Sequence, residues 1–381
     1  MRSKTCFIVF SGFNERSVIC LCRTLKELGV PFCIIALSNN DPIYQTDYAG
    51  NIATHRQHPQ LDLPGIDACL RKAMQSIPAT KYIIAPSSEF LNIFLLDNRR
   101  HFEAMGLEIP LPERAVYKQL SDKQAFATLC QTNGIPIPEE IPRNNIGDNL
   151  PIVAKPICDI TNEGIRVVPE ILETAADLRR FRETCDETFY FYQRYIKGAS
   201  YYFLIYRHAN GETNTYSQRN LLQQPNGKSM VLATGSDLYL TSWITPYLEL
   251  LENLDYRGLA MIEVKEQGGK YYMIEANPRM WGPAQLMADA GSNLFISFIN
   301  DYTGTSFPWQ REGGHNLYSW QGGIMEVIER GEKLDAHAEI KEVLETLRSE
   351  SLQDIYGRSD TAKAFKSGNV AINSNNIRKV V

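Results

Sequence analysis

The chain has 381 residues, a formal net charge of -5 at pH 7 and a pI near 5.8. This acidic balance offers no long-range attraction to nucleic acid or to an anionic membrane surface, so neither is an expected partner. The length suits two or three domains of roughly 100–150 residues each. No apolar run approaches the ~18 residues of a membrane span, and the eight cysteines form no pair of CxxC motifs. We therefore expect a cytoplasmic protein with reduced thiols.

The first part of the chain alternates between strand and helix patterns. Residues 5–10 and 32–37 are apolar runs that predict strands, and the helix between them ends near Leu28. Another apolar run, 82–85, leads into a further helix. This alternation predicts a small parallel α/β domain over residues 1–110.

Polar residues follow two of these predicted strands. Ser11-Gly12 follows the first strand, and Ser87-Ser88-Glu89 follows the strand at 82–85. Ligands of open α/β sheets bind at the carboxyl ends of strands, so these residues are candidates for selecting the first substrate. Ordinary turn and capping chemistry explains them equally well.

A first lobe is predicted over residues 111–197. Prolines at positions 110 and 112 indicate a linker, and Ser121 to Gln124 forms an S-x-x-Q capping box that predicts a helix start. Residues 152–156 and 189–196 predict two strands of this lobe.

A second lobe is predicted over residues 198–305, where the patterns become those of antiparallel hairpins. Residues 306–381 predict a mainly helical C-terminal extension, in which we identify no chemistry. Paired glycines and Asn-Gly are strong signals for hairpin turns. The predicted hairpins are 201–206 with 213–219 around Asn210-Gly211, and 258–264 with 271–276 around Gly268-Gly269.

Two glutamates stand within apolar strands of the second hairpin. Period-two alternation puts Glu275 and Asn277 on one face of their strand, and Glu263 lies in the partner strand. Two carboxylates and an amide oxygen suit Mg²⁺, which uses one or two carboxylates together with nucleotide phosphates. The alternative is a pair of solvent-facing glutamates. However, an acid inside an apolar run usually has a partner or a function, because burying an unpaired carboxylate is costly.

Three cationic residues are candidates for binding phosphate. Arg279 follows Asn277-Pro278, so its guanidinium would lie beside the predicted metal cluster, unless it pairs with one of the glutamates instead. Lys155 ends an apolar strand and precedes a proline. Lys123 lies in the first turn of its predicted helix, where the dipole disfavours a cation by ~0.3–1 kcal/mol, so a phosphate partner would explain its placement.

In these motifs the chain resembles the ATP-grasp superfamily, and within it the carboxylate-amine ligases and carbamoyl-phosphate-synthase-like proteins. The resemblance covers Leu111 to Asp301 and is strongest at Glu275-Ala276-Asn277-Pro278-Arg279. The interval of 12 residues from Glu263 to Glu275 is also typical of the family. Each motif is weak alone, but their order and spacing are specific. The others are Leu120-Ser121-Asp122-Lys123, Gly134-Ile135-Pro136-Ile137-Pro138, Val153-Ala154-Lys155-Pro156 and Gln193-Arg194-Tyr195-Ile196-Lys197-Gly198.

The resemblance implies an ATP-grasp fold of the α/β and α+β class, with an N-terminal parallel domain and two lobes that clasp ATP. It implies a ligase that uses ATP and Mg²⁺, with Mn²⁺ as an alternative ion. The enzyme would join a small-molecule carboxylate to an amine through an acyl-phosphate. Many relatives are dimers, so a homodimer is expected by analogy. The implied site residues are Lys123 and Lys155 on ATP; Gln193, Arg194, Tyr195 and Ile196 at the adenine hinge; Glu263, Glu275 and Asn277 on metal; and Arg279 and Lys155 in catalysis.

The sequence departs from the family pattern at several positions. The loop after Lys155-Pro156 carries only Gly164, where the family usually has several glycines and a serine around the phosphates. Arg194 stands where an acid is common, and Ser200 stands where many members carry a carboxylate for the ribose hydroxyls. Arg219 resembles a basic position near the acceptor site.

Two alternatives to a ligase therefore stay open. One is an ATP-grasp enzyme of another reaction type, such as a kinase or an enzyme that forms carbamoyl phosphate or a thioester. The other is a nucleotide-binding regulatory protein without turnover. A Rossmann-like oxidoreductase ranks last, because the first strand lacks G-x-G-x-x-G.

Overall fold

The structure is a computed structural model that describes residues 3–157, 167–311, 317–336, 352–353, 355 and 358–363. Its N-terminal sheet has the strand order β3-β2-β1-β4-β5, with all pairs parallel. Strand order reverses at β1, so the topological switch point lies between β1 and β4. The elements are β1 (Ser3–Phe10), α1 (Glu15–Glu27), β2 (Phe32–Ala36), β3 (Ile52–His55), α2 (Leu63–Ser76), β4 (Ala79–Ile84), α3 (Glu89–Asp97), α4 (Arg99–Ala104) and β5 (Leu107–Glu108).

Local sequence explains these N-terminal elements. All side chains from Cys6 to Phe10 in β1 are buried, as expected of a parallel strand covered by helices on both faces. Helix α1 is followed by Gly29, whose φ of 64° few other residues adopt easily. Helix α3 begins after Ser88, whose hydroxyl accepts a hydrogen bond from the Leu91 amide. The predicted parallel sheet is confirmed.

The small sheet has the strand order β7-β6-β8 and antiparallel pairing. One helix start differs from the prediction: Ser121 ends α5, and the Asp122 carboxylate caps α6 by accepting bonds from the Gln124 and Ala125 amides. The predicted Ser121 capping box is therefore wrong. The elements are α5 (Arg114–Ser121), α6 (Lys123–Thr132), β6 (Ile152–Pro156), β7 (Glu170–Leu172), α7 (Ala175–Thr184) and β8 (Tyr190–Arg194).

The large sheet has the strand order β13-β12-β9-β10-β11-β14-β16, and β15 pairs with β10. Both predicted hairpins are confirmed, since β9 pairs with β10 and β12 with β13 in antiparallel register. The elements are β9 (Ser200–Arg207), β10 (Thr213–Gln223), β11 (Met230–Ser236), α8 (Thr245–Asn253), β12 (Gly258–Gln267), β13 (Lys270–Asn277), α9 (Ala284–Asp289), α10 (Leu294–Thr303), β14 (Leu317–Ser319), α11 (Gln321–Glu329), β15 (Asp335–Ala336) and β16 (Leu352–Gln353).

Short 3-10 helices occur in the connections. They are η1 (Pro42–Gln45), η2 (Ala49–Asn51), η3 (Arg143–Asp148), η4 (Glu187–Phe189), η5 (Pro225–Gly227), η6 (Leu238–Leu240), η7 (Ser242–Ile244) and η8 (Ser359–Thr361). In the described part of the C-terminal extension, α11 and η8 fit the helical prediction. The strands β14, β15 and β16 were not predicted, because each is only two or three residues long.

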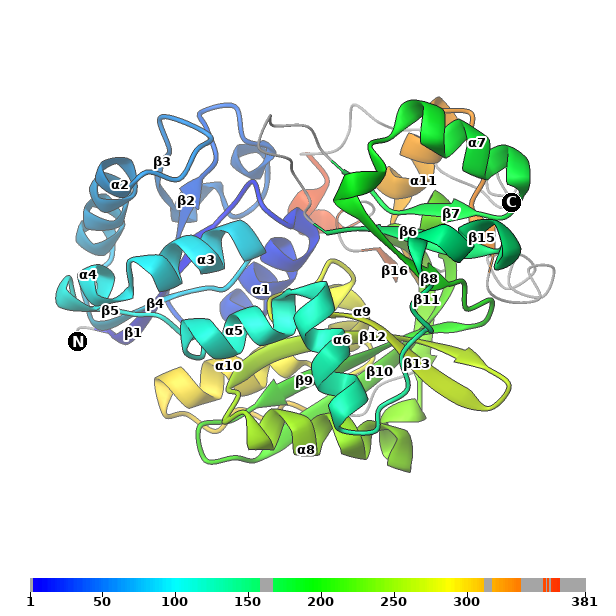
Figure 1. Ribbon diagram of the computed structural model, residues 1–381. Helices are drawn as coiled ribbons and strands as arrows, with labels where there is room; N and C mark the ends of the chain where they lie inside the picture. Colours follow the sequence, from blue (N-terminus) through cyan, green and yellow to red (C-terminus); the bar gives the residue numbers. More distant parts are fainter. Residues whose placement is uncertain are drawn as a thin grey trace.

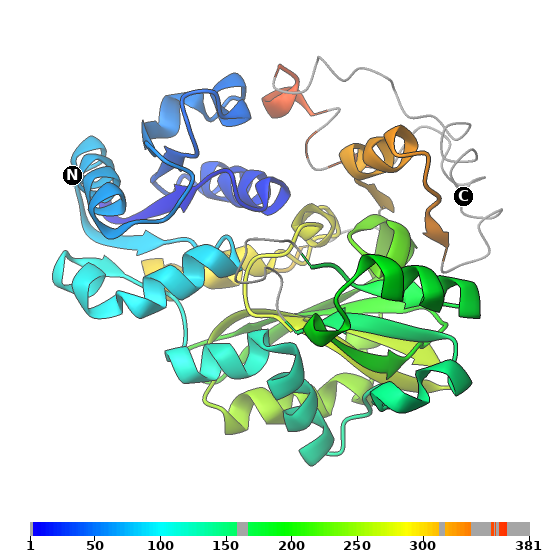
Figure 2. The same cartoon turned by 45° about the horizontal axis from the view of Figure 1, so that its top comes forward.

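Helices cover both faces of the large sheet. One face, with α1, α9 and α10, forms a core shared with the N-terminal domain (Figure 1). The other face packs against α6 and α8. Figure 2 shows the N-terminal domain, the small sheet and the large sheet as neighbouring bodies. The domain boundaries predicted near residues 110, 197 and 305 remain predictions. Among the described residues, no helix has the length and apolar character needed to cross a bilayer.

Candidate functional site

Glu263 and Glu275 lie directly opposite each other on β12 and β13. Glu263 is only 5% exposed, and Glu275 is half-buried. The Ser200 hydroxyl on β9 donates a hydrogen bond of 2.8 Å to Glu263 Oε1. The hairpin thus places two carboxylates side by side on one face of the large sheet. A β-bulge between Glu263 and Val264 makes this pairing, because the unbroken register of the turn would set Glu263 opposite Ile274.

The two carboxylates repel each other. Burial raises the pKa of Glu263 to about 7, and the charge of Glu275 adds to this rise. Lys265, the Ser200 hydroxyl and Lys155 act in the opposite direction. A bound cation would relieve this repulsion, because it stabilises the charged form of both acids.

Asn277 and Arg279 extend the site beyond Glu275. The Asn277 amide nitrogen donates to Glu275 Oε1 at 2.8 Å, and Arg279 donates to Asn277 Oδ1 at 2.7 Å. Arg279 also donates to the Met280 carbonyl at 3.1 Å. Its hydrogen bonds within the described chain therefore go to an amide and a backbone carbonyl. Neither glutamate is its hydrogen-bond partner, which was the alternative left open by the sequence.

Lys155 connects the small sheet to the large sheet. It stands on β6, and its ammonium donates a hydrogen bond of 2.9 Å to the Ile274 carbonyl on β13. Burial lowers the pKa of Lys155 to about 8, while the charges of Glu275 and Glu263 oppose the shift. Lys123, the first residue of α6, is near enough for its charge to lower the pKa of Lys155 further.

The predicted hinge, Gln193 to Ile196, follows the edge of the small sheet at the end of β8. Gln193 is buried, and its Oε1 has no hydrogen-bond partner among the described residues. The exposed side chain of Arg194 pairs with Glu139 at 2.6 Å, which accounts for a cation where the family usually has an acid. Ile196 is buried, and the ammonium of Lys265 lies 5.0 Å from the ring centroid of Tyr195.

The oxygen atoms around Glu263 suit a hard metal ion with few protein ligands. Within the described chain, no group of three or more His, Cys, Asp or Glu residues is arranged to hold a metal. The site instead offers two carboxylates and the amide oxygen of Asn277. The second oxygen of Glu263 and of Glu275 takes no hydrogen bond from the described residues. Two such oxygens suit Mg²⁺, which keeps several waters and needs few protein ligands.

The switch point of the N-terminal sheet borders this site. Asn14, which precedes α1 and follows β1, donates a hydrogen bond of 2.7 Å to the Met280 carbonyl. The Met280 amide donates to the Pro86 carbonyl at 3.2 Å. The Ser11 hydroxyl donates to the Asp41 carboxylate, which is the turn role that the sequence also allowed. The loops after β1 and β4 therefore contact the segment that follows Arg279.

Some residues of the site were not predicted. Lys265 is buried two positions beyond Glu263 on the same face, so the alternation that identified Glu263 also carried this signal. Asn220 lies beside Ser200 and donates to its hydroxyl oxygen at 2.8 Å, a contact with no signal in the sequence.

One sequence expectation is untested and another finds no support. The sparse glycine loop, 157–166, lies outside the described residues beyond Ile157. Arg219 pairs with Tyr201 and Thr234 across neighbouring strands. Alternation along β10 points its side chain to the face opposite Glu263, which argues against the expected place near the acceptor site.

The chain was compared with known proteins. No family model and no curated protein matches it. Among solved structures, the ADP complex of N5-carboxyaminoimidazole ribonucleotide synthetase is similar with a TM-score of 0.64 and 14% identity, over 87% of this chain and 85% of that chain. Biotin carboxylase from Campylobacter jejuni, described as a β-γ-ATP complex, gives a TM-score of 0.61 and 15% identity, over 82% of this chain and 74% of that chain.

A third similar structure is the biotin carboxylase domain dimer of 2-oxoglutarate carboxylase from Hydrogenobacter thermophilus, in complex with MgADP, ADP and bicarbonate. Its TM-score is 0.60 with 15% identity, over 83% of this chain and 74% of that chain. The chain has the ATP-grasp fold. At these identities the likeness establishes the fold alone, and it confirms the fold class expected from the sequence. Within the ATP-grasp fold, Lys155 reaches from one lobe to the strand that carries Glu275.

Proposed function

We propose that this protein is an ATP- and magnesium-dependent ligase that activates a carboxylate as an acyl-phosphate for attack by an amine. The observation that carries the proposal is the facing pair Glu263 and Glu275, with Lys155 hydrogen-bonded beside Glu275 and Arg279 held on Asn277. Phosphoryl transfer needs positioned cations and metal ligands more than a protein base, and this site supplies both.

Each predicted residue has a role in this proposal. Mg²⁺, or Mn²⁺ in its place, would neutralise charge on the phosphates when bound by Glu263, Glu275 and Asn277. The ammonium groups of Lys123 and Lys155 bind ATP phosphates, and the backbone of residues 193–196 binds adenine. The Arg279 guanidinium binds the acyl-phosphate, whose three oxygens match its donors.

The reaction has two steps. An oxygen of the substrate carboxylate attacks the γ-phosphorus of ATP, the bond from that phosphorus to the β,γ-bridging oxygen breaks, and ADP leaves. The amine nitrogen then attacks the acyl carbon, the bond from carbon to the phosphate oxygen breaks, and inorganic phosphate leaves. The nitrogen loses a proton to solvent, and an amide remains.

The similar structures support the cofactors, because their descriptions name ADP, a β-γ-ATP complex and MgADP as bound groups. One of them is described as a dimer, which supports a homodimer for this chain as part of the proposal. The carboxylate and the amine are proposed by class only.

The test is ADP release by the purified protein with Mg·ATP and pooled amino acids, amino sugars and small carboxylates. We expect release that requires both a carboxylate and an amine, and its loss in Glu275→Ala. Glu252→Ala, which removes an exposed glutamate on α8, is the matched control and should retain the wild-type rate. Equal ADP release by Glu275→Ala and wild type would refute the proposal, as would the absence of Mg-dependent nucleotide binding in calorimetry.

A further inference from the structure

A row of side chains crosses the large sheet from the carboxylate pair. Glu275 pairs with Glu263, Glu263 pairs with Tyr202 on β9, and Tyr202 pairs with Gln218 on β10. Directly paired residues share a face, so Gln218 stands on the face that carries both carboxylates. Neighbouring strands are about 4.8 Å apart, which places the Gln218 backbone about 10 Å from that of Glu263.

A chain of hydrogen bonds also links Gln218 to Glu263. Gln218 Nε2 donates to Asn220 Oδ1 at 2.8 Å, and Asn220 Nδ2 donates to Ser200 Oγ at 2.8 Å. Ser200 Oγ donates to Glu263 Oε1 at 2.8 Å. Gln218, Asn220 and Ser200 are all completely buried.

The carboxylate fixes the direction of this chain. The Ser200 hydroxyl donates to Glu263 Oε1, as it must whenever this carboxylate is ionised and can only accept. The Ser200 oxygen then accepts from the amide nitrogen of Asn220, whose oxygen accepts in turn from the amide nitrogen of Gln218. The orientation of both amides therefore follows from the charge at the end of the chain. The other atom of this amide, Gln218 Oε1, takes no part in the chain of hydrogen bonds.

This oxygen has no hydrogen-bond partner among the described residues, although Gln218 is 0% exposed. A buried amide oxygen without a partner is costly, and such groups in native proteins usually meet a water or a ligand. The oxygen accepts hydrogen bonds and donates none. The missing partner must therefore carry an N–H or O–H group.

The residue paired with Gln218 marks the position of this oxygen relative to the reacting groups. Tyr202 is paired with Glu263 on one side and with Gln218 on the other, and Glu263 faces Glu275. Gln218, its direct cross-strand neighbour, lies at the edge of the same site.

We infer that Gln218 Oε1 is part of the acceptor subsite and accepts a hydrogen bond from an N–H group of the amine substrate. The inference rests on the proposed function. An amine brings N–H donors to the reacting end of this site, whereas the phosphates of ATP and the substrate carboxylate bring only acceptor oxygens there. Gln218 binds and orients the acceptor, and it takes no part in forming the acyl-phosphate.

The test separates the acceptor step from the activation step with the variant Gln218→Met, which keeps the side-chain length and removes the amide. Hydroxylamine is a small nucleophile that attacks an acyl-phosphate directly, giving a hydroxamate and phosphate. We measure hydroxamate formation with Mg·ATP and the carboxylate pool, and amide formation with the pool of amino acids and amino sugars. The matched control is Gln224→Met, since Gln224 is also buried but bonds to the Gly323 carbonyl and Glu326.

For Gln218→Met we expect hydroxamate formation within about twofold of wild type and a rise of roughly tenfold in the KM of the stimulating amine, as for one lost hydrogen bond. An unchanged amine KM would overturn the inference, and so would a parallel loss of both activities, which would mean that Gln218 acts only on Glu263. Hydroxamate formation by the wild type with no amine accepted would also overturn it, because the site would then take another class of acceptor. No hydroxamate from the wild type would instead reject the proposed function on which the inference rests.

Discussion

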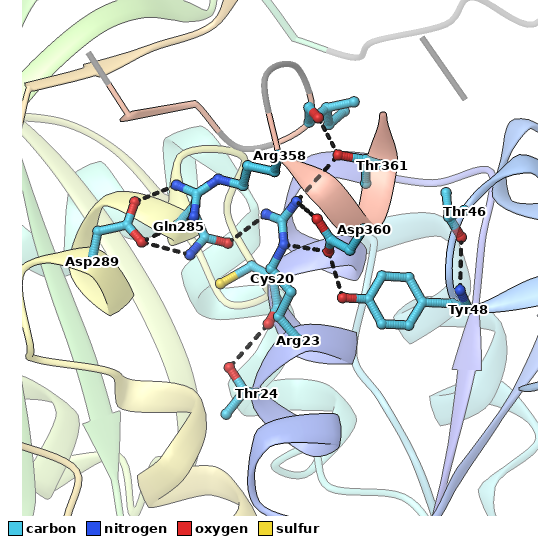
Figure 3. Close-up of polar contacts among 11 residues, drawn as sticks. Cys20, Arg23, Thr24, Thr46, Tyr48, Gln285, Asp289, Arg358, Asp360 and Thr361 are labelled. Carbon is cyan, nitrogen blue, oxygen red and sulfur yellow. Dashed lines mark hydrogen bonds and ion pairs between the residues drawn. The ribbon is translucent and has the colours of Figure 1, made fainter. Parts of the chain in front are cut away.

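The C-terminal residues 358–363 contact the N-terminal domain through a buried ion pair, and we expect Asp360→Ala to destabilise the protein strongly. Asp360 Oδ2 and Oδ1 accept hydrogen bonds of 2.6 and 3.0 Å from Arg23 on α1. The Tyr48 hydroxyl donates to Oδ2 at 2.6 Å. Arg23 also donates to Gln285 on α9 at 2.8 Å (Figure 3). The Arg23–Asp360 pair therefore joins residues 358–363 to α1 and α9, which are distant in sequence.

The expected loss in the free energy of unfolding follows from the burial of this ion pair. The side chains of Arg23 and Asp360 are 10% and 17% exposed, so the alanine variant leaves a buried guanidinium without its counter-charge. Breaking a buried ion pair by removing one partner costs about 3–5 kcal/mol. Because some solvent reaches this pair, we expect the lower end, about 3 kcal/mol. By comparison, losing an exposed pair costs about 0–1 kcal/mol.

The assay is urea denaturation followed by tryptophan fluorescence, which reports the free energy of unfolding. The control is Glu103→Ala, which removes an exposed partner of Arg99 on helix α4, and it should change the free energy by less than about 0.5 kcal/mol. A loss for Asp360→Ala no larger than that of the control would refute the reasoning.

The Arg23–Asp360 pair also predicts that the free energy of unfolding depends on pH. Burial acts to raise the pKa of Asp360, but the hydrogen bonds from Arg23 and Tyr48 outweigh it and hold the pKa below its ordinary value of 3.8. A carboxyl group whose pKa is lower in the folded state stabilises the protein above its unfolded pKa. This stabilisation is lost as the pH falls through the folded value. The difference in the free energy of unfolding between wild type and Asp360→Ala should therefore be largest at pH 7 and should shrink below about pH 4.

Of three further predictions, two concern the nucleotide site and one concerns a close backbone contact. Glu275→Gln should weaken Mg-dependent ADP binding in calorimetry by at least about tenfold, because one charged ligand of the cation is lost. Unchanged binding would exclude Glu275 from the metal site. Since the pKa of Lys155 is lowered to about 8, ADP affinity should fall as the pH rises from about 7 to about 9, and Lys155→Met should remove that slope. A Cβ at Gly198 would lie 1.7 Å from the Glu266 carbonyl oxygen. Gly198→Ala should therefore lower the free energy of unfolding by about 1–3 kcal/mol in urea denaturation. An unchanged midpoint would contradict this close approach.

The two acidic strands were predictable from the sequence, because period-two alternation puts Glu275 and Asn277 on one face of β13 and the Gly268-Gly269 turn brings Glu263 onto the neighbouring strand. The direct pairing of the two carboxylates was not predictable, since the register of the turn would pair Glu263 with Ile274, and a β-bulge between Glu263 and Val264 shifts it to Glu275. The parallel N-terminal domain followed for a similar reason, since apolar runs alternating with helices have few other arrangements. The ATP-grasp fold itself was recognised from the order of these motifs.

The sequence did not decide which residue caps the start of helix α6. Both Ser121 and Asp122 are good N-cap residues, and the structure selected Asp122 because α5 continues through Ser121. The polarity of a single hydroxyl or carboxylate cannot decide between adjacent positions when another helix ends there.

Only the tertiary structure decided which distant groups meet. Lys155 reaches the Ile274 carbonyl 119 residues away, and Arg23 reaches Asp360 across 337 residues. Gln218 lies in a run of four polar residues, Ser217 to Asn220, and the sequence does not show which of them face the carboxylates. That is decided by the position of β9 between β10 and β12. Sequence periodicity fixes which face a side chain occupies, whereas the packing of sheets and helices fixes what that face meets.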